Sequence, residues 1–270
     1  MSRSSLPGSN PPSSIRVINR RLVQSLARAL DIPLGVSVST ESEIGIAKGI
    51  TGKVKETRSD SGLSSDDPRL LPDIVTALRE SGQLNISRPD TAEEYWRGEH
   101  DGWYVYERVL ATPVVLPLKD RLPDGVSGPD ALTVWVIDPP EPLQPREEWD
   151  FSTSFVFIVE ELGEFRWPMG WFLSGISALR LVAEVLTDPR PETISHDSMH
   201  RLGATPDRFG RWQDDHPVER LRVIGGTVGR PRIIDTVYKI EYMTDEQSYP
   251  YNGAQLRVSD ILAYPLYIAE

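Results

Sequence analysis

Apolar residues along this chain change repeatedly between a helical spacing and an extended spacing, and each change marks an expected element. Residues 15–18 predict a short strand, and residues 19–31 predict an amphipathic helix. Residues 36–55 alternate broadly between apolar positions and polar or glycine positions, which predicts two strands that can pair as a hairpin. The expected buried face of the first helix consists of Leu22, Val23, Leu26 and Leu30.

A second helix is expected between residues 66 and 82, where start and stop signals frame a helical apolar stripe. Asp66 or Asp67 can cap it, and Pro68 is tolerated near the first turn, where its missing N–H costs nothing. Gly82 is a natural C-terminal stop. The side chains expected to be buried along this helix are Leu70, Leu71, Ile74, Val75 and Leu78.

The middle of the chain has a mainly extended pattern. After a short helical piece at about residues 91–97, an Asp-Gly turn leads into an aromatic strand over residues 103–110. Because proline cannot donate a ladder hydrogen bond, Pro113, Pro117 and Pro123 are expected to limit how far this strand continues as a central one. Further strands are expected at residues 132–137, 155–160 and 165–172.

The last third of the chain predicts two helices and two strands. The first helix covers residues 174–186. The second opens at Asp214 or Asp215 with Pro217 and ends at Gly225-Gly226. The strands are expected at residues 233–242 and 256–268.

These elements predict an α+β fold with a largely antiparallel sheet and several short helices, because strands do not alternate strictly with helices. One domain is expected over residues 15–270, with a subdivision near residues 139–150 as the alternative. Residues 1–14 are rich in Ser, Pro and Gly and are expected to form a disordered tail.

Composition and charge narrow the classes of function. The 270 residues include no cysteine, which excludes disulfides, thiolate metal sites and a catalytic thiol, and is compatible with a reducing cytoplasm. A net charge of -11 and a pI near 5.0 argue against general nucleic-acid binding, although a local basic patch is compatible with them. No signal peptide and no run of roughly 20 apolar residues is evident. We therefore expect a cytoplasmic protein without stable membrane insertion.

Three blocks resemble an uncharacterised, mainly actinobacterial family of domains of unknown function. The blocks are the helix at 66–82 with Gly102-Trp103-Tyr104-Val105-Tyr106-Glu107, the strand 155–159 leading to residues 174–181, and the closing strand 262–269. The resemblance spans most of the chain and implies an actinobacterial origin and a place in a multi-gene defence or regulatory system. The histidine that this family often carries in its small-residue turn is absent from Ser174 to Arg180.

Residues 195–200, Ser-His-Asp-Ser-Met-His, are the sharpest candidate for chemistry. His196 and His200 are four residues apart and share one face of a helix, which is the spacing of metalloprotease helices. Asp197 follows the first histidine, where those enzymes carry glutamate. A divalent metal such as Zn would need a third ligand, which only folding can bring from His216 or Asp214. The alternative is a surface helix start capped by Ser195 or Asp197.

The expected interaction site is the aromatic segment Trp-Pro-Met-Gly-Trp, with Trp167, Met169 and Trp171 as its contact residues. Phe165 and Phe172 lie close to it in sequence. If this turn is exposed, it suits a protein partner or an apolar ligand. Burial in the core is the alternative interpretation.

Other motifs do not complete a catalytic set. Residues 225–230 are glycine-rich, but they follow a helix and precede a strand, the reverse of a phosphate-binding loop. Adjacent acids such as Glu160 and Glu161 are not shown to face each other as glycosidase acids must. We therefore predict a non-enzymatic interaction, sensor or accessory module that has a protein partner and no cofactor. A metal-dependent hydrolase and a membrane-acting effector, through the alternating segment at 44–54, are the alternatives.

Overall fold

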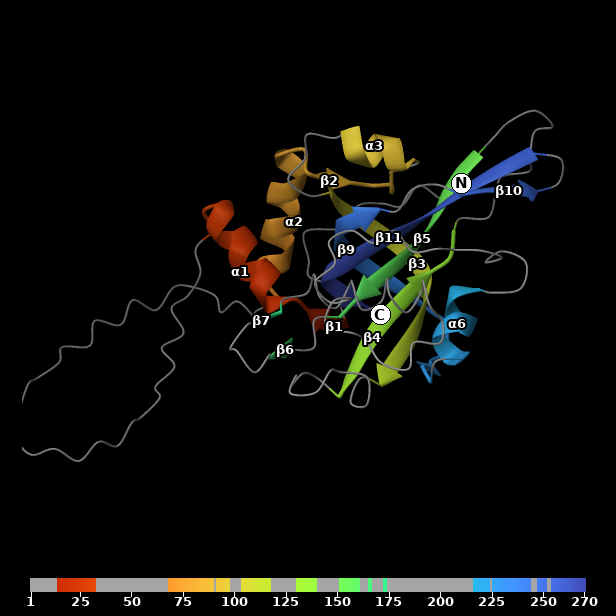
Figure 1. The fold of residues 1–270 in the computed structure, drawn as a ribbon. Helices are drawn as coiled ribbons and strands as arrows, with labels where there is room; N and C mark the ends of the chain where they lie inside the picture. Colours follow the sequence, from red (N-terminus) through yellow and green to blue (C-terminus); the bar gives the residue numbers. More distant parts are fainter. Residues whose placement is uncertain are drawn as a thin grey trace, which may run out of the picture.

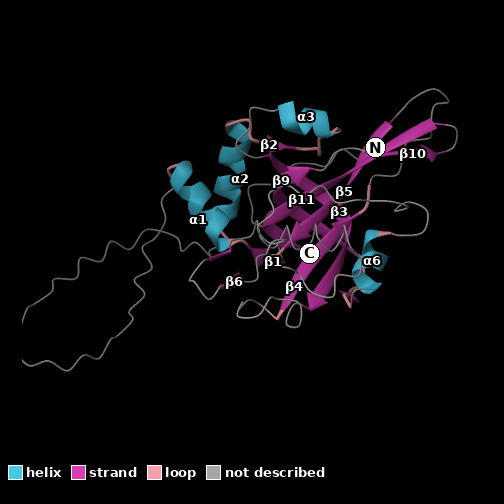
Figure 2. Cartoon of the chain, viewed as in Figure 1, coloured by secondary structure: helices cyan, strands magenta, loops and turns pink. Residues whose placement is uncertain are grey.

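The computed structural model of the protein describes residues 14–32, 68–89, 91–97, 103–117, 130–139, 151–160, 165–166, 172–173, 216–223, 225–243, 247–251 and 254–270. Within these ranges the fold is a strongly curved, mostly antiparallel sheet with short α-helices on its outside (Figures 1 and 2).

Five strands of the sheet pair in a closed ring. β3 (Trp103–Pro117) pairs antiparallel with β4 (Ala131–Ile137), which pairs antiparallel with β5 (Phe151–Val159). β5 runs parallel to β11 (Ala254–Ala269), and β11 pairs antiparallel with β9 (Arg232–Met243). Because β9 also pairs with the first half of β3, the ring closes into a small barrel. Side chains along each strand therefore alternate between the interior and the outer face.

Shorter strands extend this ring at its edges. β1 (Ile15–Ile18) and β10 (Gln247–Tyr251) pair antiparallel with β11, and β8 (Thr227–Val228) pairs antiparallel with β3. β2 (Leu84–Asn85) runs parallel to the start of β3. At Tyr104, β3 pairs with β9 on one edge and with β2 on the other, so β2 lies on the same edge of β3 as β4.

Large apolar side chains from all five ring strands fill the barrel interior. They come from alternate positions of each strand, as a barrel with one buried face per strand requires. Their burial provides most of the hydrophobic stabilisation that ring closure gains. The fully buried members of this cluster are Val105, Ala111, Trp135, Ile137, Val156, Ile158, Ile234, Tyr238, Ile240, Met243, Ile261, Ala263 and Ile268.

Two helices cover part of the outer face of the barrel. α1 (Arg20–Ala29) and α2 (Leu70–Glu80) lie side by side against β3, β9 and β11 (Figure 1). α1 begins at Asn19, whose side-chain oxygen accepts the N–H of Leu22 at 3.0 Å. The buried contact layer comprises Val23, Leu26, Leu70, Leu71, Ile74, Val75 and Leu78 from the helices, and Tyr104, Tyr106, Val237, Leu266, Tyr267 and Ala269 from the strands.

Two shorter helices lie elsewhere on the outside of the sheet. α3 (Ala92–Arg97) follows β2, and α6 (Pro217–Val223) packs against β3 on the side of the barrel away from α1 and α2 (Figure 1). α6 ends where Gly225 has a φ of +95° and where a Cβ on Gly226 would lie 2.5 Å from the carbonyl oxygen of Leu221. The glycine pair that predicted a helix stop is therefore required by both conformation and space.

Several sequence predictions are confirmed. All five side chains expected to be buried on α2 are buried, and Gly82 follows that helix with a φ of +72°. The short helix before the aromatic strand, the strands around residues 132–137 and 155–160, and the two late strands are present. The broad expectation of a mostly antiparallel sheet with a few short helices is also confirmed, in an arrangement that suits an α+β or a mainly β class.

The expectation that proline limits the aromatic strand was wrong for Pro113, whereas Pro117 is the last residue of β3. β3 continues for 15 residues through Pro113 to Pro117, with β4 on one edge and with β8 and β9 on the other. Pro113 has no N–H to donate, but its carbonyl oxygen accepts the N–H of Gly229 at 2.7 Å. A cross-strand contact that needs only an acceptor therefore lets proline lie inside a central strand.

Two further expectations need correction. Residues 165–172 do not form one strand, because β6 (Phe165–Arg166) pairs antiparallel with β7 (Phe172–Leu173). α2 begins at Leu70 after Arg69, which provides no side-chain cap, so the expected start at Asp66 or Asp67 was wrong.

Other expectations cannot be compared with the structure. The expected hairpin at 36–55 and the expected helix at 174–186 lie outside the described residues. Among the helices that the structure describes, none is long and apolar enough to cross a membrane.

Candidate functional site

The residues that the sequence singled out for binding or metal chemistry lie outside the described part of the chain. These are Trp167, Met169 and Trp171 of the expected interaction turn, and His196 and His200 of the expected metal site. The described polar contacts of the barrel are made mainly by residues that the sequence did not single out, among them Arg16, Arg88 and Arg232.

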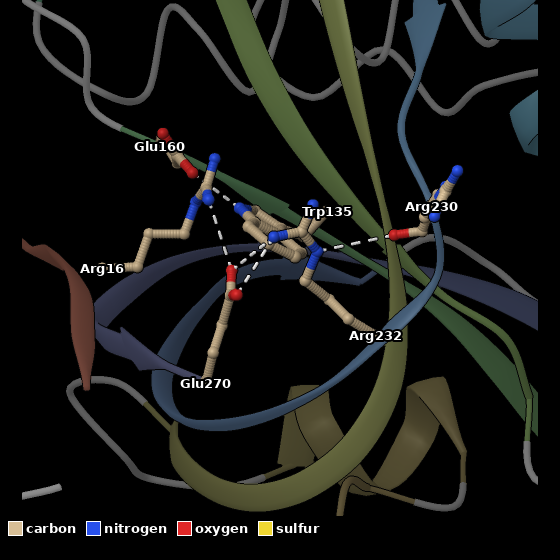
Figure 3. Close-up of polar contacts among 6 residues, drawn as sticks. All are labelled: Arg16, Trp135, Glu160, Arg230, Arg232 and Glu270. Atoms are coloured by element: carbon tan, nitrogen blue, oxygen red, sulfur yellow. Dashed lines mark hydrogen bonds and ion pairs between the residues drawn. The ribbon is translucent and has the colours of Figure 1, made fainter. Parts of the chain in front are cut away.

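One end of the barrel holds a polar group around an indole ring, which we call the Trp135 cluster: Arg16, Trp135, Glu160, Arg232 and Glu270 (Figure 3). Trp135 is fully buried and belongs to the interior core. Its Nε1–H donates a 2.7 Å hydrogen bond to Oε1 of Glu160, the residue that follows β5. A buried indole N–H without an acceptor would destabilise the core, so Glu160 satisfies a structural need.

Two arginines cover the indole ring of Trp135. The guanidinium carbons of Arg16 and Arg232 lie 5.4 Å and 5.9 Å from the ring centroid. Both arginines also donate to Glu270: Nη1 of Arg232 lies 2.8 Å and 3.0 Å from the two carboxylate oxygens, and Nη1 of Arg16 lies 3.3 Å from Oε1. In Figure 3 these three side chains converge on Trp135. Cation–π contacts and charge-assisted hydrogen bonds thus join β1, β9 and the end of β11 to β4.

Two arginines and two glutamates make up the charged side chains of the Trp135 cluster. Burial raises the pKa of the Glu160 carboxyl, while the hydrogen bond from Trp135 and the nearby Arg16 guanidinium oppose that rise. Arg230 adjoins the cluster, since its carbonyl oxygen accepts from Nε of Arg232 at 3.5 Å. Arg230 contributes only its carbonyl oxygen to the cluster, on a chain whose net charge is -11.

A second polar contact, which we call the seam pair, joins Arg88 and Glu107 in the barrel wall. β4 pairs with residues 111–117 of β3 and with residues 156–159 of β5, which leaves the earlier parts of both strands without a β4 neighbour. Arg88 fills this gap. Its Nε donates to Oε1 of Glu107 at 2.7 Å, and its Nη1 donates to the carbonyl oxygens of Ser154 at 2.8 Å and Asp138 at 3.5 Å. One guanidinium thus links β3, β5 and the end of β4.

Both charges of the seam pair are largely buried, with side chains that are 11% and 14% exposed. Burial alone would lower the pKa of the Arg88 guanidinium, but the Glu107 carboxylate and the Tyr238 hydroxyl raise it overall. Burial and then Glu107 raise the pKa of the Tyr238 hydroxyl well above its ordinary value. That hydroxyl and Oε2 of Glu107 interact electrostatically, although neither meets the geometry of a full hydrogen bond. Arg88 therefore stays charged and Tyr238 stays neutral.

A third polar contact lies on the outer face, where α1 and α2 cover the barrel. Asp235 accepts hydrogen bonds from the hydroxyls of Tyr106 at 3.0 Å and Tyr267 at 2.9 Å. Both tyrosines are cross-strand partners of Val237, so they lie on opposite sides of β9. Burial, reinforced by Asp235, raises the pKa of Tyr106 to about 12 and raises the pKa of Tyr267 as well. One carboxylate thereby joins three strands of the ring.

His216 is the one expected auxiliary metal ligand that the structure describes. Its Nδ1 accepts the N–H of Val218 at 3.2 Å, which leaves the Nε2 proton to face Oδ1 of Asp138 at 3.1 Å. Both ring nitrogens of His216 are therefore engaged. Among the described residues there is no group of three or more His, Asp or Glu side chains that could hold a metal ion.

Comparison of this chain with protein-family models, with curated proteins and with solved structures finds no match. The resemblance of three blocks to an actinobacterial family therefore stays an expectation, and no relative supplies a function for the barrel.

The sequence analysis missed the three arginines that organise the polar contacts of the barrel, Arg16, Arg88 and Arg232. A usable signal is present for two of them, because Arg16 and Arg232 each stand within or beside a run of β-branched residues. A charged residue at such a position can be expected to point toward a barrel end. Its partner could not be predicted, since Glu270 and Trp135 come near only when the ring closes.

Replacing Arg88 by methionine should destabilise the fold, because the Glu107 carboxylate would then be buried without its partner. Removing one member of a buried ion pair costs about 3–5 kcal/mol, and urea unfolding of R88M against the wild type measures this loss. The double variant R88M/E107M should recover much of it, since no uncompensated charge remains.

The matched control for R88M is R222M, which removes an exposed ion pair between Arg222 and Glu219 on α6. This control should cost at most about 1 kcal/mol. Equal losses in R88M and R222M would contradict the role of the seam pair in closing the barrel wall.

Between pH about 10 and pH about 12 the free energy of unfolding should fall, because Tyr106 has a pKa of about 12 in the fold and an ordinary value of 10.0 in the unfolded chain. The raised pKa favours the neutral hydroxyl, so its contribution is complete below the unfolded pKa and is lost as pH rises through the folded one. Y106F should show a smaller fall, by on the order of 2 kcal/mol, in urea unfolding at alkaline pH. If the free energy of unfolding falls by the same amount in Y106F and in the wild type over this pH range, Tyr106 is not the cause of the fall.

Proposed function

We propose that this protein is a non-enzymatic interaction module that binds a protein partner through the outer wall of its barrel. The observation that carries the proposal is an exposed apolar pair on the outer face of the sheet, near the start of β9. Leu110 of β3 and Ile233 of β9 are direct cross-strand partners, and they are 57% and 59% exposed. We call these two residues the outer apolar pair.

The outer apolar pair suits an interface for physical reasons. Cross-strand neighbours have Cβ atoms about 5 Å apart, so the two side chains form one continuous apolar surface. The two strands pair directly with each other at this point, and β4 begins to pair with β3 at the next residue, Ala111. Arg108 is exposed two residues before Leu110, and arginine beside apolar side chains is typical of protein interfaces.

The polar contacts of the barrel support a scaffold role for the residues that make them. Glu107 is bound to Arg88, and Asp235 is bound to two tyrosines. These carboxylates hold strands together, and each is engaged by a partner of opposite charge or by hydroxyl donors. A rigid barrel that presents a fixed apolar surface is the arrangement that results.

The biological setting is part of the same proposal. The module would serve as a sensor or accessory component of a bacterial multi-gene system, as the resemblance to an actinobacterial family implies.

Replacing Leu110 or Ile233 by glutamate should abolish partner binding, because a charge would be buried in the interface. Loss of an interface hot spot of about 2 kcal/mol weakens binding about 30-fold. The measurement is affinity purification of tagged wild type, L110E and I233E from the native host, followed by titration of the recovered partner.

The matched control is I86E, because Ile86 is as exposed as the outer apolar pair, at 61%, but does not belong to β3 or β9. I86E should retain the partner. A partner that L110E and I233E bind as well as the wild type does would contradict the proposed surface, and so would recovery of the wild type without any stoichiometric partner.

A further inference from the structure

We propose that Arg16 and Arg232 form a carboxylate-binding site for an acidic segment of the protein partner, and that Glu270 occupies this site in the free protein. The inference rests on the proposed function as an interaction module and specifies the chemistry of the partner.

The site already holds a carboxylate, which is the first observation in its favour. Arg232 reaches both oxygens of Glu270, at 2.8 Å and 3.0 Å, and Arg16 reaches Oε1 at 3.3 Å. The two arginines come from β1 and β9, far apart in the sequence, and converge on one acidic group (Figure 3). Each arginine contributes one nitrogen, Nη1, to this carboxylate, and these contacts are charge-assisted hydrogen bonds.

The indole ring of Trp135 holds both arginine side chains in place. Trp135 is fully buried, and both guanidinium groups lie within 6 Å of its centroid, at 5.4 Å and 5.9 Å. Cation–π contact keeps the positive charges oriented whether or not Glu270 is bound. The receptor part of the site is therefore preorganised independently of its present occupant.

Solvent reaches the ion pairs, so another carboxylate can replace Glu270. The side chains of Arg16, Arg232 and Glu270 are 46%, 35% and 32% exposed. Ion pairs at this degree of exposure contribute little to stability and exchange readily. An acidic residue of a partner can thus take the arginines without disrupting the barrel, while the Glu270 side chain moves into water.

The charge around the site favours an acidic segment. Arg230 is exposed, and its guanidinium has no ion-pair partner among the residues that the structure describes. A segment that carries two acids can therefore bind Arg230 as well as the Arg16–Arg232 pair. On a chain with a net charge of -11, an exposed arginine beside the Arg16–Arg232 pair favours an acidic ligand at this place.

The site adjoins the outer apolar pair. Arg232 and Ile233 are consecutive in β9, and their cross-strand partners in β3 are Ala111 and Leu110. The arginines lie at the barrel end and the apolar pair lies on the adjacent outer wall. A partner segment with an acidic residue beside an apolar one would contact both surfaces as it passes over the rim.

A single carboxylate fits this site better than a phosphate group. Glu160 lies at the N–H edge of the same indole ring, with Oε1 2.7 Å from Nε1 of Trp135, and interacts electrostatically with Arg16. A second negative charge on the ligand would therefore be opposed by Glu160. The net charge of the protein further opposes a polyphosphate such as a nucleic-acid backbone.

The test is fluorescence anisotropy with a fluorescein-labelled hexaglutamate peptide as the probe. Glu270→Gln should bind the peptide about fivefold more tightly than the wild type, because the internal competitor loses its charge. Arg232→Gln should bind about fivefold more weakly, and E270Q/R232Q should not recover. Affinity should fall as salt rises from about 50 mM to about 300 mM, because the pairs are exposed.

The matched control is Glu219→Gln. This substitution removes one exposed negative charge from α6, and the ion pair with Arg222 is lost as a result. E219Q changes the net charge of the chain as E270Q does, so it should bind the probe as the wild type does. Equal affinity of E270Q and E219Q would overturn the proposal, and so would unchanged binding by R232Q. If inorganic phosphate displaces the peptide at a lower concentration than acetate does, the site binds anions in general, and the proposal of a carboxylate site is wrong.

The outcomes separate this inference from the proposed function. If E270Q and R232Q leave peptide binding unchanged while L110E still loses the natural partner, the carboxylate site is wrong and the interaction module stands. If the peptide responds as expected but L110E and I233E keep the partner, the outer apolar pair is wrong and the carboxylate site stands.

Discussion

The pairing of β9 along both of its edges is the constraint on which the rest of this structure depends. β9 joins β3 on one side and β11 on the other, and these two strands are already connected through β4 and β5. Without β9 the sheet would be open, and the apolar side chains of its concave face would have no common interior. With β9 in place, Trp135, Tyr238 and Ile261 meet inside one barrel. Ring closure also gives α1 and α2 a continuous outer surface to cover.

The polar groups occur where backbone pairing alone does not complete the barrel. Arg88 lies in the wall beyond the end of β4, and the Trp135 cluster lies where β9 begins and β11 ends. In each place a guanidinium replaces missing ladder contacts by binding carboxylates or carbonyl oxygens of several strands. The difference between them is exposure: the seam pair is enclosed, whereas the arginines near Glu270 face solvent and remain available to a ligand.

Local structure was largely predictable from the sequence, and the closure of the ring was not. The apolar stripe from Leu70 to Leu78 determines α2, and Gly225-Gly226 determines the end of α6, because both signals act within a few residues. The effect of Pro113 was not predictable, since it depends on whether Gly229 needs an acceptor opposite it. The contact of Arg16 with Glu270 joins residues 254 positions apart, which no local pattern encodes. The sequence did place Leu110 within the aromatic strand, but its exposure depends on which helices cover which face.

Native-state hydrogen exchange, followed residue by residue by NMR, is the most direct test of the closed barrel. Amides along both edges of β9, around Val237 and Tyr238, should exchange only through global unfolding, because this strand is paired on both sides there. Amides of β10, which pairs with β11 alone among the described strands, should exchange earlier. Rapid exchange of alternate β9 amides, at the rate seen for β10, would show that one edge of β9 is free and would contradict closure of the ring.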